Sequence, residues 1–390
     1  MQTLTGLDRL LADPACLRGR RIGIITNPTG ITRDLTSMVD AICALPDVTV
    51  RALFGPEHGA RGEVQDALTI GSVIDEATGL PVYSLYGEHK KPTAEMLGDI
   101  DLLIYDIQDV GCRYYTYAYT LSYVMEAAAE HGVEVLVLDR PNPINGVQIE
   151  GNILDPAFSS FVGRYALPIR HGLTNAEFAR FINTEFGIGC NLSTLPMQGW
   201  QRELWFDQTA LPWVTPSPNL PSLDCATVYP GTCLFEGTNL SEGRGTTHPF
   251  EWLGAPWMNG RAWAEALNRL DLPGARFRPV VFAPTYSKHL GVACQGVQVH
   301  VTDRNLLNAT AVGLHMLATC RRLHPDQFEF LPTSWEGHHL PVPCPHFDLL
   351  AGNAHIRNAL SANVPVPDIM ATWSQIAQHF EQQRAPYLLY

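Results

Sequence analysis

Short apolar segments alternate with helical segments through the first third of the chain, and this rhythm limits the fold more than any other feature. Residues 33–45 and 116–131 have helical spacing. The apolar segments are RIGIITN (21–27), VTVRALFGPEHG (48–59), LPVYSLYG (80–87), DLLIYDIQDVG (101–111) and VEVLVLDRPNP (133–143). Such alternation predicts a parallel, doubly wound sheet with helices on both faces.

The loops that follow these segments carry more chemistry than ordinary turns need. Turns alone favour Gly, Asn, Asp and Pro, but these loops also contain Glu57-His58, Arg61, Arg113 and Tyr114-Tyr115. Ligands of open α/β sheets bind beyond the carboxyl ends of the strands. We therefore predict a ligand site at this edge, with ordinary turns as the alternative.

A nucleotide is not the expected ligand. The first strand is followed by TNPTGIT instead of GxGxxG, and no GxxxxGK[ST] occurs. The usual phosphate cradles are therefore absent, and no cofactor is predicted.

The remainder of the chain reads as a mixed α and β region. A capping box, Thr174 with Glu177, opens a helix over 173–187, and residues 293–303 alternate like a half-exposed strand. Further helices are expected over 305–322 and 369–384. We predict an α/β protein with a Rossmann-like, doubly wound parallel sheet domain over 1–155 and a C-terminal α+β auxiliary domain over 156–390.

Composition excludes several classes of partner. The chain has 390 residues, 46% of them hydrophobic, and a formal net charge of −13. An acidic chain is not expected to bind nucleic acid, and no apolar run of about 18 residues predicts a membrane span. Nine cysteines without a CxxC pair indicate reduced thiols in the cytoplasm. The alternative location is outside the cell, after removal of a leader. The oligomeric state is not predicted.

Three glutamates in glycine-containing loops are the strongest candidates for catalysis. Glu57 lies in FGPEHG, and Glu236 and Glu242 lie in FEGTNLSEGRG. Two carboxylates facing each other across a cleft can cleave a glycosidic bond, because one protonates the leaving oxygen while the other attacks or activates water. The alternative is that they are solvated loop acids.

Other residues suit a sugar ligand or a supporting role. Tyr114, Tyr115 and Asn219 offer the aromatic faces and amide donors that bind sugars, although some of these tyrosines are expected in the core. Asp106 and Asp139 follow strands, where they either support a binding loop or cap the next helix. The histidines are dispersed and no HExxH occurs, so no metal is predicted.

Several long motifs resemble those of the NamZ-type exo-β-N-acetylmuramidases, formerly a bacterial family of unknown function. They include LFGPEHGARG (53–62), YDIQDVGCRYYTY (105–117), VLDRPNPINGVQIEG (137–151), SFVGRYALPIRHGLT (160–174), PWVTPSPNLP (212–221) and YPGTCLFEGTNLSEGRGTTHPFEWLGAPW (229–257). The resemblance spans almost the whole chain. It implies a Rossmann-like domain, an auxiliary domain and a cleft between them. It also implies release of N-acetylmuramic acid from the non-reducing end of peptidoglycan-derived saccharides.

The resemblance also suggests roles for single residues. Glu57 is the expected catalytic acid, and either Glu236 or Glu242 is the second carboxylate. Arginines are expected to hold the lactyl carboxylate of the muramyl sugar. The predicted substrate contacts are His58, Arg61, Asp106, Gln108, Arg113, Tyr114, Tyr115, Asp139, Asn142, Arg170, His171, Asn219, Asn239 and Arg244.

Two other functions compete with this hypothesis. The first is a non-catalytic protein that binds muropeptides or sugars in the same cleft, with the acids as hydrogen-bond acceptors. The second is a metal-dependent hydrolase that uses Asp106, Asp139 and histidines.

Overall fold

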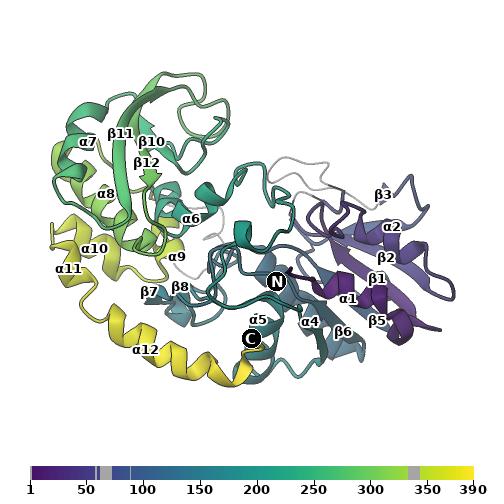
Figure 1. Cartoon of the computed structure of the whole chain (residues 1–390). Coiled ribbons are helices and arrows are strands. Elements are labelled where there is room, and N and C mark those ends of the chain that lie inside the picture. Colours follow the sequence, from purple (N-terminus) through teal and green to yellow (C-terminus); the bar gives the residue numbers. More distant parts are fainter. Residues whose placement is uncertain (1, 58, 62–72, 88, 333–342) are drawn as a thin grey trace.

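A seven-stranded sheet forms the first half of the computed structural model, which describes residues 2–57, 59–61, 73–87, 89–332 and 343–390 (Figure 1). Its strand order is β3-β4-β2-β1-β5-β6-β9, and only β3 runs antiparallel to its neighbour. Strands are added on both sides of β1, which confirms the predicted doubly wound arrangement. The strands are β1 (Arg21–Thr26), β2 (Thr49–Gly55), β3 (Val73–Ile74), β4 (Pro81–Ser84), β5 (Leu102–Asp106), β6 (Glu134–Leu138) and β9 (Asn191–Leu195).

The two faces of this sheet bury separate cores, because successive residues of a strand point in opposite directions. Leu102 and Ile104 of β5 pack with the first two helices, whereas Leu103 packs in the larger core with the next two long helices. One face is covered by α1 (Gly6–Ala12) and α2 (Met38–Cys43), and the other by α4 (Tyr117–His131) and α5 (Asn175–Glu185). The short α3 (Ala94–Leu97) precedes β5.

The second half is built on a three-stranded antiparallel sheet with the order β10-β12-β11. Helices α6 and α8 cross beside it at two glycines. A Cβ on Gly231 would lie 1.8 Å from the carbonyl oxygen of Ala309, and one on Gly313 would lie 2.3 Å from that of Gly231. The elements are α6 (Leu223–Thr232), β10 (Trp252–Ala255), α7 (Gly260–Asn268), β11 (Ala275–Phe282), β12 (Cys294–Val301) and α8 (Ala309–Leu323).

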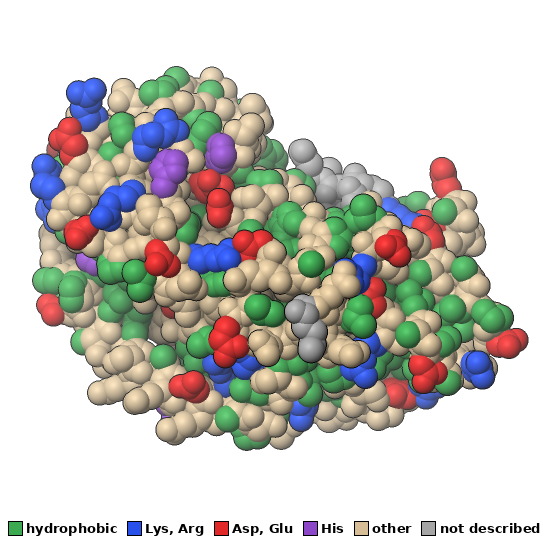
Figure 2. Space-filling view, viewed as in Figure 1, with side chains coloured by type: hydrophobic (Ala, Val, Ile, Leu, Met, Phe, Trp, Pro, Cys, Tyr) green, Lys and Arg blue, Asp and Glu red, His purple; other side chains and the backbone are tan. Residues whose placement is uncertain are grey.

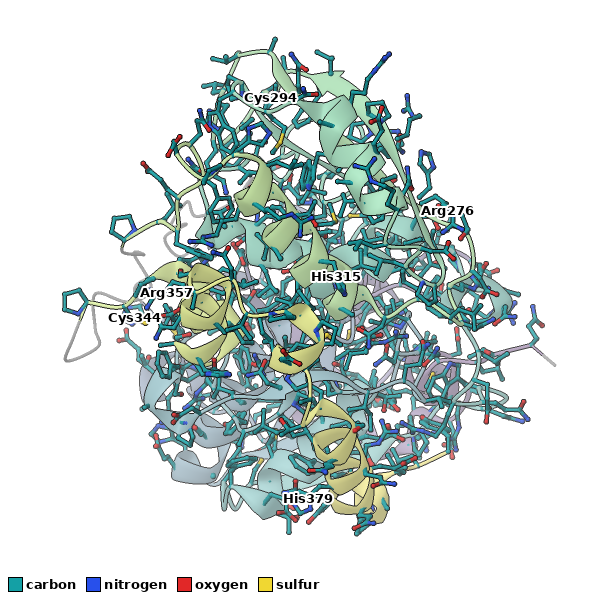
Figure 3. All side chains as sticks on the ribbon, turned by 90° about the vertical axis from the view of Figure 1, so that its left-hand side faces the viewer. Arg276, Cys294, His315, Cys344, Arg357 and His379 are labelled. Atoms are coloured by element: carbon teal, nitrogen blue, oxygen red, sulfur yellow. The ribbon has the colours of Figure 1, made fainter. Side chains whose placement is uncertain are left out.

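The last helices lead the chain back to the first half. Figure 3 shows them descending from the region of His315 on α8 to His379 on α12, which contacts a small two-stranded sheet of β7 and β8. Beyond α12, the hydroxyl of Tyr390 donates a hydrogen bond to Asp139 at the end of β6, at 2.6 Å. The elements are β7 (Glu150–Ile153), β8 (Pro168–Arg170), α9 (His346–Ala351), α10 (His355–Ser361), α11 (Val366–Ile369) and α12 (Trp373–Arg384).

Most predicted elements are present, with shorter or interrupted helices. The capping box of Thr174 and Glu177 is formed, and residues 294–301 are the predicted strand. The helix expected over 33–45 begins only at Met38, because Leu35 has a left-handed φ of 63°. Strand β9 lies beyond residue 155, where we predicted the domain boundary, so the first sheet takes a strand from the chain after that boundary.

The surface in Figure 2 carries acidic and basic side chains interspersed, without a large patch of one sign on the face shown. Among the described residues, no helix is long and apolar enough to span a bilayer. The predicted location stays a prediction.

Candidate active site

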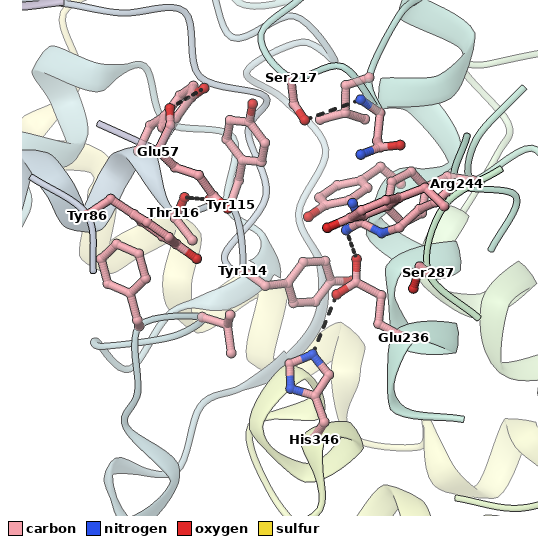
Figure 4. A pocket seen from close by; sticks show the side chains of 18 residues that line it. Glu57, Tyr86, Tyr114, Tyr115, Thr116, Ser217, Glu236, Arg244, Ser287 and His346 are labelled. Atoms are coloured by element: carbon pink, nitrogen blue, oxygen red, sulfur yellow. Dashed lines mark hydrogen bonds and ion pairs between the residues drawn. The ribbon is translucent and has the colours of Figure 1, made fainter. Parts of the chain in front are cut away.

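A cavity of about 250 Å³ lies between the loops of the first sheet and the second half of the chain. Glu57 and Thr116 line it from the first half, and Glu236, Arg244 and His346 line it from the second (Figure 4). Two of the three predicted catalytic glutamates therefore share one cavity, although 179 positions separate them in the sequence (236 minus 57).

Glu57 lies in the loop that follows β2. The loop folds back tightly after the strand, because a Cβ on Gly55 would lie 2.4 Å from the backbone nitrogen of Ala60. The hydroxyl of Thr116, just before α4, donates a hydrogen bond to Oε2 of Glu57 at 3.0 Å. The residue that precedes α4 thus helps to hold this carboxylate in position.

Glu236 lies in a short 3-10 helix, Cys233–Gly237, that continues α6. Arg244 donates a hydrogen bond from Nη2 to Oε1 of Glu236 at 2.6 Å, and Nε2 of His346 lies 3.5 Å from Oε2. The glycine at 237 permits this contact with His346, because a Cβ there would lie 2.4 Å from the Cα of Phe347.

These partners determine the protonation state of Glu236. Burial by itself raises the pKa of this carboxyl group, but the charge of Arg244 and the hydrogen bond from His346 outweigh burial and lower the pKa to about 2. Glu236 is therefore ionised at neutral pH.

Glu242 lies behind the cavity wall instead of in the cavity lining. Its side chain is 2% exposed and is held by Nε of Arg244 at 3.0 Å and Nζ of Lys288 at 2.9 Å. Arg244 therefore bridges the two glutamates of this loop. The cavity receives Glu236, while Glu242 orients Arg244 from the other side.

The predicted sugar-binding residues Tyr114, Tyr115 and Asn219 also line the cavity. The ring of Tyr115 packs edge-on against Tyr117, with ring centroids 4.8 Å apart. The hydroxyl of Tyr114 donates to the carbonyl oxygen of Pro230, which lies within α6. These rings give the cavity apolar walls beside its charged groups.

Arg113 was predicted to contact substrate, but the structure gives it a different position. Its guanidinium is buried and donates to the carbonyl oxygens of Asn152 and Leu167 at 2.7 Å, and of Leu350 and Ala351 at 3.0 Å. Because these carbonyl groups come from both halves of the chain, Arg113 fastens the halves together and lies outside the cavity lining.

The structure also places Arg61 and Arg170 away from the cavity, in correction of their predicted position. Arg61 pairs with Asp75 at 2.9 Å and Asp40 at 3.1 Å and does not line the cavity. Arg170 is buried and pairs with Glu150 at 2.5 Å. Of the four predicted arginines, Arg244 alone lines the cavity.

The strand-end aspartates are used for structure. Asp106 is fully buried and paired with Arg140, whose Nη2 lies 2.7 Å from Oδ2. Asp139 accepts hydrogen bonds from the hydroxyl groups of Thr174 at 2.8 Å and Tyr390 at 2.6 Å. Burial raises the pKa of Asp139 to about 7, against the hydrogen bonds that lower it. Neither aspartate lines the cavity.

Three more predicted contacts belong to the same strand-end network. Gln108 donates to the carbonyl oxygen of Pro141 at 2.8 Å, and Asn142 donates to that of Leu173 at 2.9 Å. His171 accepts from the backbone nitrogen of Leu173 at 3.1 Å, and burial lowers its pKa to about 3. These side chains support the backbone next to the site and do not line the cavity.

Two predicted substrate contacts remain, Asn239 and His58. Asn239 donates to the carbonyl oxygen of Gln327 at 2.7 Å and ties two loops together outside the cavity lining. His58 lies outside the described residues.

Several residues of the cavity lining were not predicted from the sequence, among them His346, Tyr286 and Ser287. His346 begins α9 after a proline and has no motif around it. Tyr286 and Ser287 come directly before Lys288, one of three lysines in the chain, and this rare residue type was the only feature of the sequence that could have pointed to them. Within the described residues, no cluster of three His, Cys, Asp or Glu side chains is arranged to hold a metal ion.

The chain matches two family models that meet between residues 224 and 227. Residues 22–224 match the N-terminal part of exo-beta-N-acetylmuramidase NamZ, and residues 227–390 match its C-terminal part. The chain is 50% identical over 387 residues to the peptidoglycan beta-N-acetylmuramidase NamZ of Bacillus subtilis (strain 168). That alignment covers 99% of this chain and 91% of the relative.

Two solved structures have the same fold. Both are DUF1343 family proteins from Bacteroides fragilis NCTC 9343. One superposes with a TM-score of 0.90 at 39% identity and the other with 0.78 at 31%, each covering 100% of this chain and 99% of the other. The family models together cover most of the chain, so the resemblance drawn from the motifs is confirmed, and the chain belongs to the NamZ family of exo-beta-N-acetylmuramidases.

Proposed function

We propose that this protein is a glycosidase that releases N-acetylmuramic acid from the non-reducing end of peptidoglycan-derived saccharides. The Bacillus subtilis relative, which is named a peptidoglycan beta-N-acetylmuramidase, is 50% identical over 387 residues. The structural observation that supports the proposal is that Glu57 and Glu236 line one cavity from opposite halves of the molecule.

The environments of the two carboxyl groups suggest different roles. With its pKa held at about 2, Glu236 has no proton to give at neutral pH. It is suited to attack the anomeric carbon or to activate water. Glu57 is then the carboxyl group in the cavity lining that protonates the leaving oxygen.

The remaining lining fits a muramyl sugar. The aromatic walls suit the apolar faces of a pyranose ring, and Ser217 and Asn219 suit its polar rim. The sugar carries a lactyl carboxylate, which needs a positive partner. Arg244 is the guanidinium in the lining, and we assign it to this group as well as to Glu236.

Substitution of each acid tests the proposal. Glu57→Gln and Glu236→Gln should each lower kcat for release of N-acetylmuramic acid from a muramyl disaccharide by about 10²–10⁴-fold. Melting temperatures should stay close to that of the wild type. Glu95→Gln, at an exposed acid on α3, is the matched control and should keep full activity.

Two results would contradict this assignment. Near-normal turnover in either variant would remove that residue from the mechanism. Calorimetric binding of the disaccharide to the wild type without any turnover would favour the non-catalytic sugar-binding alternative.

A further inference from the structure

The loop between β11 and β12 supplies the one strongly exposed aromatic ring among the described residues that line the cavity. Tyr286 lines the cavity and is 40% exposed, whereas Tyr114, Tyr115 and Tyr229 are 2%, 7% and 6% exposed. A ring that is part of the lining and also faces solvent lies at the mouth. Tyr286 therefore meets whatever extends from the cavity.

The size of the cavity makes this position informative. A volume of about 250 Å³ is large enough for one substituted sugar ring. When the terminal sugar lies inside the cavity, the rest of the saccharide extends through the mouth. Ser287, which also lines the cavity, adds a hydroxyl group next to the exposed ring. An aromatic face with a polar neighbour matches the amphipathic surface of a sugar.

The loop is held firmly in place by its neighbours. Nζ of Lys288 donates to the carbonyl oxygens of Phe235 and Thr238, each at 2.8 Å, and lies 2.9 Å from Oε2 of Glu242. The hydroxyl of Thr285 donates to the carbonyl oxygen of Gly245 at 2.6 Å. The ammonium group of Lys288 is thus bound by the segment that carries Glu236.

The backbone of the loop is also in a costly conformation. Ser287 and His289, on either side of Lys288, have left-handed φ angles of 65° and 59°. Such residues persist where the surrounding contacts over-determine them, and they cluster at ligand sites. Close approach to the other loop requires the glycine at 245, because a Cβ there would lie 2.7 Å from the backbone nitrogen of Tyr286.

We propose that Tyr286 and Ser287 form a second sugar-binding site at the mouth, which holds the sugar that follows the scissile bond. The ring of Tyr286 stacks on that sugar, and the anchored loop presents the ring before substrate arrives. The proposal rests on the proposed glycosidase function and adds the leaving sugar as a recognised part of the substrate.

Two substrates separate this site from the muramyl site. One is a disaccharide of N-acetylmuramic acid followed by N-acetylglucosamine, and the other is methyl β-N-acetylmuramide, which has no second sugar. Tyr286→Ala should lower kcat/KM for the disaccharide by about three- to tenfold and leave methyl muramide within about twofold. Tyr286→Phe should behave like the wild type, because the stacking face remains. Leu290→Ala, at an exposed residue of the same loop outside the lining, is the matched control.

An equal loss on both substrates, or no loss on either, would overturn the second site. Calorimetry in the Glu57→Gln background gives the same comparison without turnover. There, Tyr286→Ala should weaken binding of the disaccharide and leave binding of methyl muramide unchanged. If the wild type binds the disaccharide through Tyr286 but hydrolyses neither substrate, the proposed activity fails while the second site stands.

Discussion

Two of the regions that bury charged side chains differ in the space beside those charges. At the strand ends, Asp106 and Arg140 pair next to a cavity of about 10 Å³, roughly the room of one water molecule. Between the halves, Glu236 and Arg244 pair next to a cavity of about 250 Å³. Similar ion pairs therefore have different roles. The Asp106–Arg140 pair stabilises the fold, whereas the Glu236–Arg244 pair faces a space that is large enough for a sugar.

The difference teaches that a buried ion pair is poor evidence of a site until its surroundings are known. Both pairs have partners within the fold, but only a pair that also lines a cavity can contact a ligand. Variants in the two regions should therefore affect different quantities, activity in one and stability in the other.

Of the variants that test this comparison, Arg244→Met should give the largest effect, on activity. We expect kcat to fall by about 10²–10³-fold, since a preorganised donor is lost from the cavity. The acid limb of the pH–rate profile should also move to higher pH, because removal of the positive charge raises the pKa of Glu236. Arg276→Met, at an exposed arginine of β11, is the control. An acid limb that does not move would contradict the role of Arg244.

Arg140→Met should act on stability instead. Removal of the guanidinium leaves Asp106 buried without its ion-pair partner, which should lower the free energy of unfolding by about 3–5 kcal/mol in urea titrations. The folded fraction should keep its kcat. The double variant with Asp106→Leu should recover part of the loss. A large fall in kcat with little loss of stability would reverse the comparison.

The pH dependence of stability should reveal Asp139. Its folded pKa of about 7 lies above the ordinary value of 3.8, so the folded state holds its proton more tightly than the unfolded state. This contribution is fully present below about pH 4 and is lost as the pH rises through 7. The free energy of unfolding of the wild type should therefore fall between pH 5 and pH 8, and Asp139→Asn should reduce this fall by about 2 kcal/mol. Equal slopes for variant and wild type in thermal melts would contradict the assignment.

Tyr390→Phe should give the smallest effect. The variant loses the hydrogen bond to Asp139 and the one accepted from the backbone nitrogen of Met197 at 2.7 Å, which should lower the free energy of unfolding by about 1 kcal/mol. The ring still packs edge-on against Trp200, so kcat should be unchanged. A loss of activity larger than the loss of stability would link this tail to the cavity.

The sequence predicted the fold well because periodicity and capping are local signals. The strand 102–106 and the capping box of Thr174 and Glu177 need only neighbouring residues to specify them. The helix predicted over 33–45 was too long, because the spacing of apolar residues does not reveal the left-handed backbone of Leu35; the observed helix begins at Met38.

The site was less predictable because the position of a polar side chain depends on distant chain segments. Arg113 and Arg244 both lie in polar, glycine-containing motifs, yet one binds four backbone carbonyl groups and the other lines the cavity. The approach of residues 152, 167 and 350–351, all distant in the sequence, gives Arg113 its structural position. His346 could not be found for the same reason, since its partner Glu236 is 110 positions away (346 minus 236).

The return of the chain to Asp139 has a consequence for biogenesis. Arg384 donates to the carbonyl oxygens of Gly146 and Gly172, each at 3.0 Å, and Tyr390 completes the shell of Asp139. A ribosome must therefore add about 250 residues after β6 before the polar groups around that strand end acquire their final partners. The sheet itself is complete once β9 has been synthesised, but these polar contacts form late because they join such distant points of the chain.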